Sequence, residues 1–229
     1  MTTGSTQGDA EQLDSGVCRV HLVRHGQTAM NVENRFRGRL DVPLSTIGRA
    51  EAWEAARRLK GAGLSVVYTS PLGRAREVAE AIATTSQLAA VREHDGLVNL
   101  DYGRWEGLTR QECADADPSD WLLYADDPEE ATCPEGESLA AAADRMVAAL
   151  KEIGRAHRGE TVAAVSHGAM LRLAVLRVAP PSGADWQFEL PTGSALAFDV
   201  DGEAITLVSR LDRTIAKREA EPGRLKRAG

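Results

Sequence analysis

The alternation of short apolar strands with helical segments most constrains the fold of this chain. Runs rich in β-branched residues at 17–23, 64–70 and 161–166 are each expected to form a buried strand. Segments suited to helices follow them, at 28–34, 46–60, from Pro71 past Ile82, 139–154 and 169–178. Strands and helices in this order form a mostly parallel sheet covered on both faces. The sequence therefore predicts an α/β fold, a three-layer α/β/α sandwich.

The end of the sequence adds a different element to this sheet. Residues 195–200 and 204–208 are two strand-like runs separated by Asp201-Gly202, a pair typical of tight hairpin turns. A hairpin reverses the chain direction, so we expect an antiparallel edge strand on an otherwise parallel sheet.

The length of 229 residues suits a single domain with two appended termini. Residues 1–16 lack the basic start and apolar middle of a secretory signal and are predicted to be a disordered leader. Residues 17–213 are expected to form the domain, and residues 214–229 a basic flexible tail. Within the domain, residues 93–137 contain 14 acidic residues and only two basic ones. We expect this acidic region to form loops and short helices, a capping insertion over a site, and its charge argues against highly anionic substrates.

Composition excludes several classes of partner. No stretch approaches 18 consecutive apolar residues, so no membrane span is expected. The basic tail contains no aromatic residue, and we expect no nucleic-acid partner. Cys18, Cys113 and Cys133 lack metal-ligand spacing and are predicted to be free thiols, which favours a cytoplasmic location. The oligomeric state stays open, with a homodimer among the alternatives.

Three of the predicted strands end in unusual polar groups. Residues 24–26 (Arg-His-Gly) follow the first strand, residues 70–74 (Ser-Pro-Leu-Gly-Arg) the second, and residues 166–168 (Ser-His-Gly) the third. Any one of these histidines or arginines alone is more often structural, as we expect for His21, His94 and His157. Because the carboxyl ends of parallel strands meet at one edge of a sheet, we expect the three groups to converge.

The combination of glycine, arginine and histidine fits a phosphoryl group. Glycines let backbone N–H groups approach an anion, and a helix N-terminus adds a favourable dipole. Guanidinium groups bind phosphate oxygens in pairs of hydrogen bonds. A neutral imidazole is able to attack phosphorus, while a second imidazole offsets charge in the transition state.

The motif LVRHGQT (Leu22 to Thr28) resembles the signature of the histidine phosphatase superfamily, which includes phosphoglycerate mutases and small-molecule phosphatases. Further similar segments follow in the family's order, namely Asn31, RFRGRLDVPLS (35–45), TSPLGRAREVAEAI (69–82), DYGRWEG (101–107), PEGES (134–138) and AVSHGAMLR (164–172). The resemblance covers most of the chain and implies a phosphatase that acts on a small phosphorylated substrate.

The resemblance also implies a role for each matched residue. His25 would become the phosphohistidine. The residues that would bind the phosphoryl group or line its pocket are Arg24, Arg74 and His167, with Asn31, the Gly168 backbone and Arg37 beside them. Neither a metal nor a cofactor is implied, since arginine and imidazole supply the positive charge.

One position departs from the family's pattern. Family members place a glutamate four residues before the glycine of the segment that here reads DYG, and this glutamate protonates the leaving oxygen. The present chain has Asn99 there, and an amide is no useful acid. Asp101 is the nearest carboxylate, and in an extended segment it would share a face with residue 99. Asp101 is therefore a candidate proton donor, with a purely structural role as the alternative.

Three functions remain open at this point. The first is an active phosphatase with a relocated acid. The second is a catalytically weak family member that binds a phosphorylated ligand. The third is a mutase, which the acidic residues 93–137 disfavour because the mutases of this family have a basic segment there.

Overall fold

The computed structural model describes residues 16–89, 91–179 and 186–211. The predicted leader lies outside the described residues except for Gly16, and the predicted tail, residues 214–229, lies wholly outside them.

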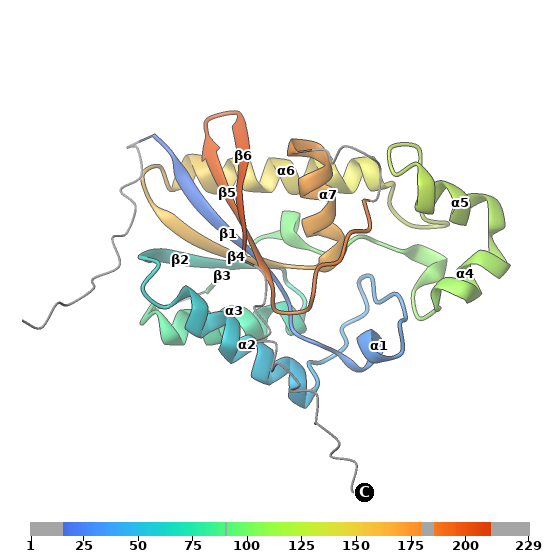
Figure 1. The fold of residues 1–229 in the computed structure, drawn as a ribbon, viewed down its shortest axis with the longest axis horizontal. Coiled ribbons are helices and arrows are strands. Elements are labelled where there is room, and N and C mark those ends of the chain that lie inside the picture. The colour runs from blue at the N-terminus through green and yellow to red at the C-terminus, as the bar shows by residue number, and fades with distance from the viewer. Residues whose placement is uncertain (1–15, 90, 180–185, 212–229) are drawn as a thin grey trace, which may run out of the picture.

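The core of the structure is a six-stranded sheet in the order β3-β2-β4-β1-β5-β6 (Figure 1). The strands are β1 (Cys18–Arg24), β2 (Leu64–Thr69), β3 (Val91–Glu93), β4 (Thr161–Ser166), β5 (Ala195–Asp201) and β6 (Ala204–Leu211). Strands β1 to β4 run parallel, and β5 runs antiparallel to β1 and pairs with β6. The predicted sheet with its antiparallel hairpin is confirmed. Strand β3 was not predicted, because three residues are too few to show an alternating pattern.

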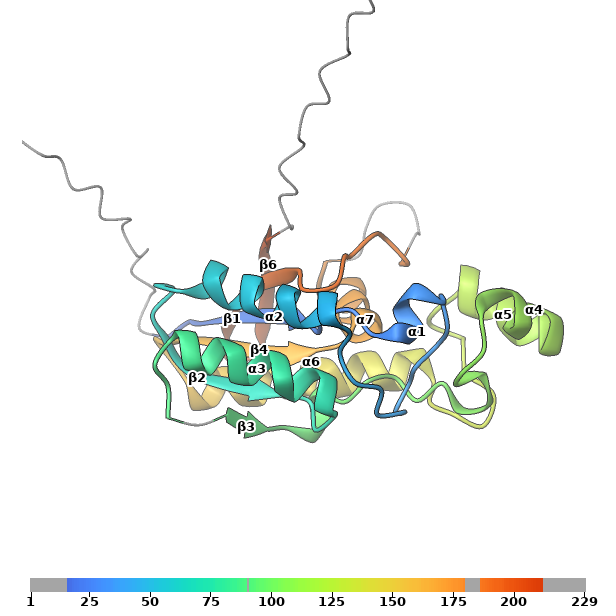
Figure 2. The same cartoon turned by 90° about the horizontal axis from the view of Figure 1, so that it is seen from below.

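Helices cover both faces of the sheet, which confirms the three-layer sandwich (Figure 2). Helices α2 (Thr46–Leu59) and α3 (Gly73–Thr85) share one hydrophobic cluster with Val23 of β1. Helices α6 (Leu139–Ala156) and α7 (Gly168–Val178) share the other with Val20 and Leu22 of the same strand. Successive strand residues thus point to opposite faces, as the pleat requires.

Helix α3 begins two residues later than predicted. The backbone N–H of Ser70 still donates to Val165, at 2.9 Å, so the sheet pairing continues to this residue. Pro71 and Leu72 then turn the chain, and Leu72 is the residue that precedes the helix. The later start matters because it places Arg74 in the first turn of α3.

The acidic region folds as predicted into short helices joined by loops. They are the 3₁₀ helices η1 (Asp95–Leu97) and η2 (Gly103–Trp105), and the helices α4 (Arg110–Ala116) and α5 (Pro118–Asp126). Helices α4 and α5 stand beyond one end of the sheet, on the side of α1 (Ala29–Val32) (Figures 1 and 2). Aromatic rings anchor this cap to the body: Phe36 lies 4.5 Å from Tyr102, and Trp186 lies 5.1 Å from Tyr124, between ring centroids.

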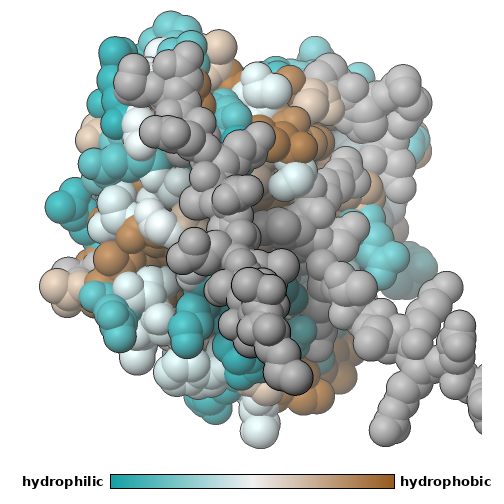
Figure 3. All heavy atoms as spheres, turned by 60° about the vertical axis from the view of Figure 1, so that its left-hand side comes forward, coloured by the Kyte–Doolittle hydropathy of each residue, from teal (hydrophilic) through white to brown (hydrophobic). Residues whose placement is uncertain are grey.

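Cys18, Cys113 and Cys133 are unpaired and buried, as the sequence predicts. No helix in the described ranges is long and apolar enough to cross a membrane. On the face drawn in Figure 3, hydrophilic side chains are interspersed with small hydrophobic areas.

Candidate active site

The carboxyl ends of three neighbouring strands bring the two predicted histidines together. His25 follows β1, and its backbone N–H donates to Ser166 at the end of β4, at 3.0 Å. His167 follows β4, and the two imidazole ring centroids are 5.2 Å apart. Both side chains are fully buried. The expected convergence of the strand-end motifs is therefore what the structure shows.

The hydrogen bonds of His25 fix which ring nitrogen has the lone pair. Nδ1 lies 2.6 Å from the carbonyl oxygen of Gly26, which is only an acceptor, so Nδ1 carries the hydrogen. Nε2 is buried and has no hydrogen-bond partner among the described residues. Gly26 allows this arrangement, because a Cβ there would lie 2.3 Å from the backbone oxygen of Gly48. His25 thus presents a lone pair on Nε2, the form that a nucleophilic imidazole needs.

The surroundings also keep the His25 imidazole neutral. Burial lowers its pKa well below the ordinary value of 6.5, and the positive charges of Arg74, Arg37 and Arg24 lower it further. The same causes lower the pKa of His167. A bound dianion would oppose this effect at His167, because an opposite charge favours the protonated ring.

Ser70 orients the second histidine and was not predicted as part of the site. Its Oγ lies 2.8 Å from Nε2 of His167, while Nδ1 of that ring is buried without a partner in the described structure. The sequence did hold a signal, because Ser70 stands directly at the end of β2. With Ser70 at Nε2, Nδ1 is the ring nitrogen that still lacks a hydrogen bond among the described residues.

Arg74 is fully buried in the first turn of α3. Its Nη1 donates to the carbonyl of Leu40 at 2.6 Å, and its Nη2 to that of Gly38 at 2.8 Å. Its Nε has no partner among the described residues, and the same holds for the Nε atoms of Arg24 and Arg37. Backbone carbonyls therefore hold Arg74 in place without neutralising its charge.

Burial and mutual repulsion lower the pKa values of the closely packed arginines. Burial, with the charges of Arg172 and Arg37, lowers the pKa of Arg24 to about 9. Burial and the charge of Arg37 lower the pKa of Arg74 to about 10, although Asp41 and Glu106 oppose this effect. All remain positively charged near neutral pH. Such a cluster is stabilised by an anion with several acceptor oxygens, as a phosphoryl group has.

A cavity of about 260 Å³ lies against this cluster, with Arg24, Arg37 and His167 on its wall and His25 and Arg74 behind it, outside the lining. The arginines that line it are Arg24, Arg35, Arg37, Arg110 and Arg172, and no carboxylate is among the described residues of its wall. Several carboxylates of the cap have other partners: Asp117, for example, bonds Arg104 and the indole of Trp105. The expectation that the acidic region disfavours anionic substrates is thus wrong for the cavity itself.

Three predicted substrate-binding residues also line the cavity: Asn31, Asn99 and Gly168. The Oδ1 of Asn31 accepts hydrogen bonds from the backbone and the hydroxyl of Thr28, at 2.9 and 3.0 Å, which leaves its NH₂ group as a donor. Gly168 begins α7, and a Cβ there would lie 3.0 Å from Nε of Arg24. Glycine at this position therefore leaves room for the Arg24 side chain.

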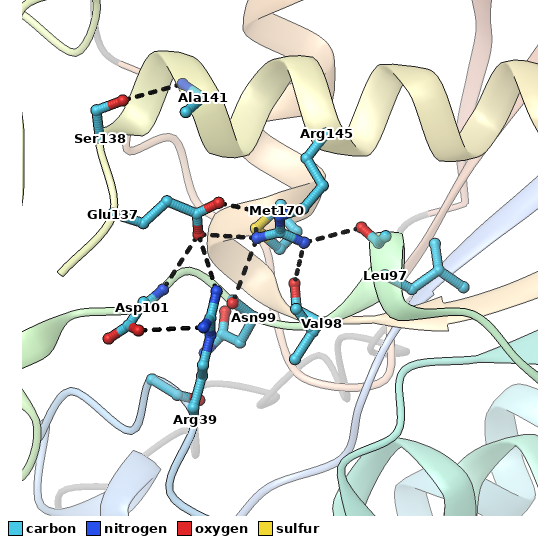
Figure 4. A network of polar contacts seen from close by, with 12 residues as sticks. Arg39, Leu97, Val98, Asn99, Asp101, Glu137, Ser138, Ala141, Arg145 and Met170 are labelled. Carbon is cyan, nitrogen blue, oxygen red and sulfur yellow. Dashed lines mark hydrogen bonds and ion pairs between the residues drawn. The ribbon is translucent and has the colours of Figure 1, made fainter.

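Asp101 is not brought into the cavity. Its carboxylate accepts from the backbone N–H of Gly103 at 2.9 Å and pairs with Arg39 at 3.2 Å (Figure 4). The argument from alternating side chains assumed an extended segment. The chain instead turns into η2, with Gly103 at a φ of 53°. Asp101 caps this turn, and Tyr102 lines the cavity in its place.

A partly buried ion pair holds the segment that contains Asn99. Arg145 of α6 donates to the carbonyls of Gly96 and Val98, both at 2.9 Å, and pairs with Glu137 at 2.9 Å (Figure 4). Glu137 also lies 3.6 Å from Arg39. Sequence reasoning gave no role to this network, which fixes the backbone around Asn99.

The neutrality of His25 leads to a prediction about its titration. Because burial and three arginines lower its pKa, its imidazole should remain neutral as the pH falls through 6.5 and protonate only in more acidic solution. Nitrogen NMR of the labelled histidines of the free protein measures this directly. A His25 signal that titrates at or above pH 6.5 would contradict the electrostatic description of the site.

Comparison with known proteins places this geometry in a family. The family model of the histidine phosphatase superfamily (branch 1) matches residues 20–213. The chain is 34% identical over 151 residues to phosphoserine phosphatase 1 of Hydrogenobacter thermophilus, covering 66% of this chain and 71% of that protein. It is also 34% identical over 175 residues to a metal-independent phosphoserine phosphatase of Arabidopsis thaliana, covering 76% and 74% of the two chains.

Comparison with solved structures agrees with this family match. Bacillus stearothermophilus YhfR superposes with a TM-score of 0.76 at 29% identity, covering 85% of this chain and all of that one. A phosphoserine phosphatase of Entamoeba histolytica, in complex with 3-phosphoglyceric acid, gives 0.74 at 25% identity, covering 86% and 98%. The resemblance seen in the sequence is confirmed, and the chain belongs to the histidine phosphatase superfamily.

Proposed function

We propose that this protein is a metal-independent phosphomonoester hydrolase that acts on a small phosphorylated metabolite through a phosphohistidine at His25. One observation supports it most. Of nine buried side-chain polar atoms that make no hydrogen bond among the described residues, six belong to Arg24, His25, Arg37, Arg74, Asn99 and His167. Five of these are nitrogens of two histidines and three arginines that lie close enough for the arginine charges to lower the pKa of both histidines.

The geometry supports a reaction in two displacements. The lone pair on Nε2 of His25 attacks phosphorus, the bond to the ester oxygen breaks, and the leaving oxygen takes up a proton. Arg24, Arg37, Arg74 and His167 stabilise the charge on the remaining phosphoryl oxygens. Water then attacks the phosphohistidine, which releases inorganic phosphate and returns the lone pair to Nε2.

The relatives support the substrate class. Two of them are named phosphoserine phosphatases, and one solved neighbour is a mycobacterial glucosyl-3-phosphoglycerate phosphatase. A cavity of about 260 Å³ suits a phosphoryl group with a small leaving group. Five arginines on its wall suit an anionic substrate.

A phosphate-release assay on a panel of small phosphomonoesters tests this function. We expect release that exhaustive chelation leaves unchanged, since guanidinium and imidazole groups supply the positive charge. Saturable binding of phosphorylated ligands without release would instead identify a binding protein. Isomerised phosphate esters in place of free phosphate would identify a mutase.

The proton donor is tested by varying the leaving group. With Asn99 in place of an acid, aryl phosphates should turn over readily and alkyl phosphates slowly. Asn99→Glu should then accelerate alkyl phosphates by at least about tenfold and aryl phosphates little, since general acids contribute roughly 10²–10⁴-fold when well placed. Paired measurements of kcat/KM on both ester types give the result.

Asp101→Asn is the companion variant. If Asp101 moves into the cavity and donates the proton, the native enzyme should hydrolyse alkyl esters well, and Asp101→Asn should make them slow. Steep leaving-group dependence in the native protein that Asp101→Asn leaves unaltered would exclude Asp101 as the donor.

We also propose that the protein works in the cytoplasm, because three unpaired cysteines suit a reducing compartment. Fractionation of cells that produce the protein tests this. Recovery outside the cytoplasm would contradict it.

A further inference from the structure

Asn99 is a buried side chain on the cavity wall with an acceptor oxygen that has no hydrogen bond in the described part of the chain. It is 4% exposed, and its Oδ1 has no hydrogen-bond donor among the described residues. A buried carbonyl oxygen without a donor loses the hydrogen bonds that water would give it. A ligand that brings a donor to this atom therefore gains more than it would at an exposed site.

The orientation of the amide is fixed by its other end. Nδ2 of Asn99 lies 3.0 Å from the carbonyl oxygen of Gly38, which accepts only. Turning the amide over would place two acceptor oxygens against each other. Oδ1 is thus the atom that remains for a ligand, and Arg145 holds the backbone beneath it (Figure 4).

The carbonyl of Gly38, which binds Asn99, also places this side chain beside the reacting centre. Gly38 O also accepts from Nη2 of Arg74, at 2.8 Å. Arg74 is the charge that most strongly lowers the pKa of both His25 and His167. Asn99 therefore sits next to the phosphoryl end of the cavity, where the ester oxygen and the carbons closest to it lie.

Apart from the exposed Asn34 and the Nδ1 of His167, the other polar groups on the wall are donors or already have partners. Arginine side chains are donors only, and the Oδ1 of Asn31 is already satisfied by Thr28. The hydroxyls of Tyr102 and Tyr124 lie 3.3 Å apart and pair with each other. A substrate that fits this wall has many acceptor atoms, and a donor on its leaving group is matched by the buried Oδ1 of Asn99.

We propose that Asn99 selects phosphate esters whose leaving group has a neutral hydroxyl on the carbon next to the phosphorylated one, and that Oδ1 accepts the hydrogen bond from this hydroxyl. The inference rests on the proposed function and names its substrate class, the monophosphates of diols and polyols. A hydroxyl suits this position better than an ammonium group, because the cavity already holds five arginines. Asn99 is then a positioning residue in the place where relatives of this family have an acid.

Three esters that differ in one substituent test the proposal. They are ethyl phosphate, 2-hydroxyethyl phosphate and 2-aminoethyl phosphate, measured as kcat/KM on the intact protein. We expect the hydroxyl to raise kcat/KM over ethyl phosphate by about tenfold or more, since a buried acceptor discriminates against analogues that lack the donor. The amino ester should be slower than the hydroxyl ester.

Asn99→Leu removes the acceptor and should bring the ratio of the hydroxyl ester to the ethyl ester close to one. A hydroxyl also makes the alcohol a slightly better leaving group, but that effect persists in the variant, so the difference between the two proteins isolates the hydrogen bond. Where Asn99→Leu does not fold, Asn99→Ala removes the same oxygen. Arg104→Gln is the control, because Arg104 lies outside the cavity wall and pairs with Asp117 and Glu135.

The outcomes separate this inference from the function on which it rests. A native ratio near one, or a high ratio that Asn99→Leu retains, overturns the role of Asn99, while hydrolysis of an aryl phosphate by the same preparation leaves the phosphatase function standing. Preference for the amino ester overturns the neutral hydroxyl. A preparation that hydrolyses no ester overturns both.

Discussion

His25→Ala is expected to lower kcat by at least about 10⁴-fold, because the loss of a nucleophile that works as a unit with its neighbours removes most of the rate enhancement. His25 combines a buried Nε2 that has no hydrogen-bond partner in the described structure with the nearby charges of Arg74, Arg37 and Arg24. Steady-state hydrolysis of an aryl phosphate gives the measurement, since such esters need little help from a proton donor.

His157→Ala serves as the control for this variant. His157 follows α6 and bonds Tyr68 at 3.0 Å and Glu160 at 2.7 Å, away from the cavity. Its replacement should cost stability and leave kcat of the folded protein close to native. A His25→Ala protein with ordinary activity would show that another group attacks phosphorus.

Arg74→Ala should lower kcat/KM by about 10²–10³-fold, the range for removing one preorganised donor from a transition state. The change removes a buried charge beside both histidines and an Nε donor that has no hydrogen-bond partner among the described residues. Both kcat and KM should suffer, because the guanidinium binds the ground-state dianion and binds the transition state more strongly.

Arg76→Ala is the matched control on the same helix. Arg76 lies two residues further along α3 and pairs with Glu93 at the surface, at 2.5 Å. Its loss should change kcat/KM by no more than a few-fold. An equally small effect at Arg74 would reduce that residue to a support for the carbonyls of Gly38 and Leu40.

The positions of the site residues could be predicted because they depend on the sheet. Arg24, His25 and His167 stand directly at strand ends, and strand ends follow from apolar runs that the sequence shows openly. Parallel pairing of β1 with β4 then brings residues far apart in the chain to one edge. The position of Arg74 could be predicted as well, because it lies in the first turn of the helix that follows β2.

Features that depend on turns and long-range polar contacts could not be predicted in this way. The place of Asp101 depends on a left-handed Gly103 and on Arg39, and neither leaves a periodic pattern. Arg145 and Ser70 act through single hydrogen bonds to segments distant in sequence. The prediction that the acidic cap disfavours anionic substrates was wrong for a related reason. A count of acidic residues does not say which of them face the cavity.

The central claim is that His25 is phosphorylated during turnover. Rapid acid-free quenching of the native enzyme with a ³²P-labelled ester, followed by peptide mapping, tests it most directly. The account predicts an acid-labile, base-stable phosphoprotein within the first turnover, labelled on the peptide of His25 and absent from His25→Ala. Hydrolysis that proceeds with no phosphoenzyme, or with the label on another residue, would contradict the account.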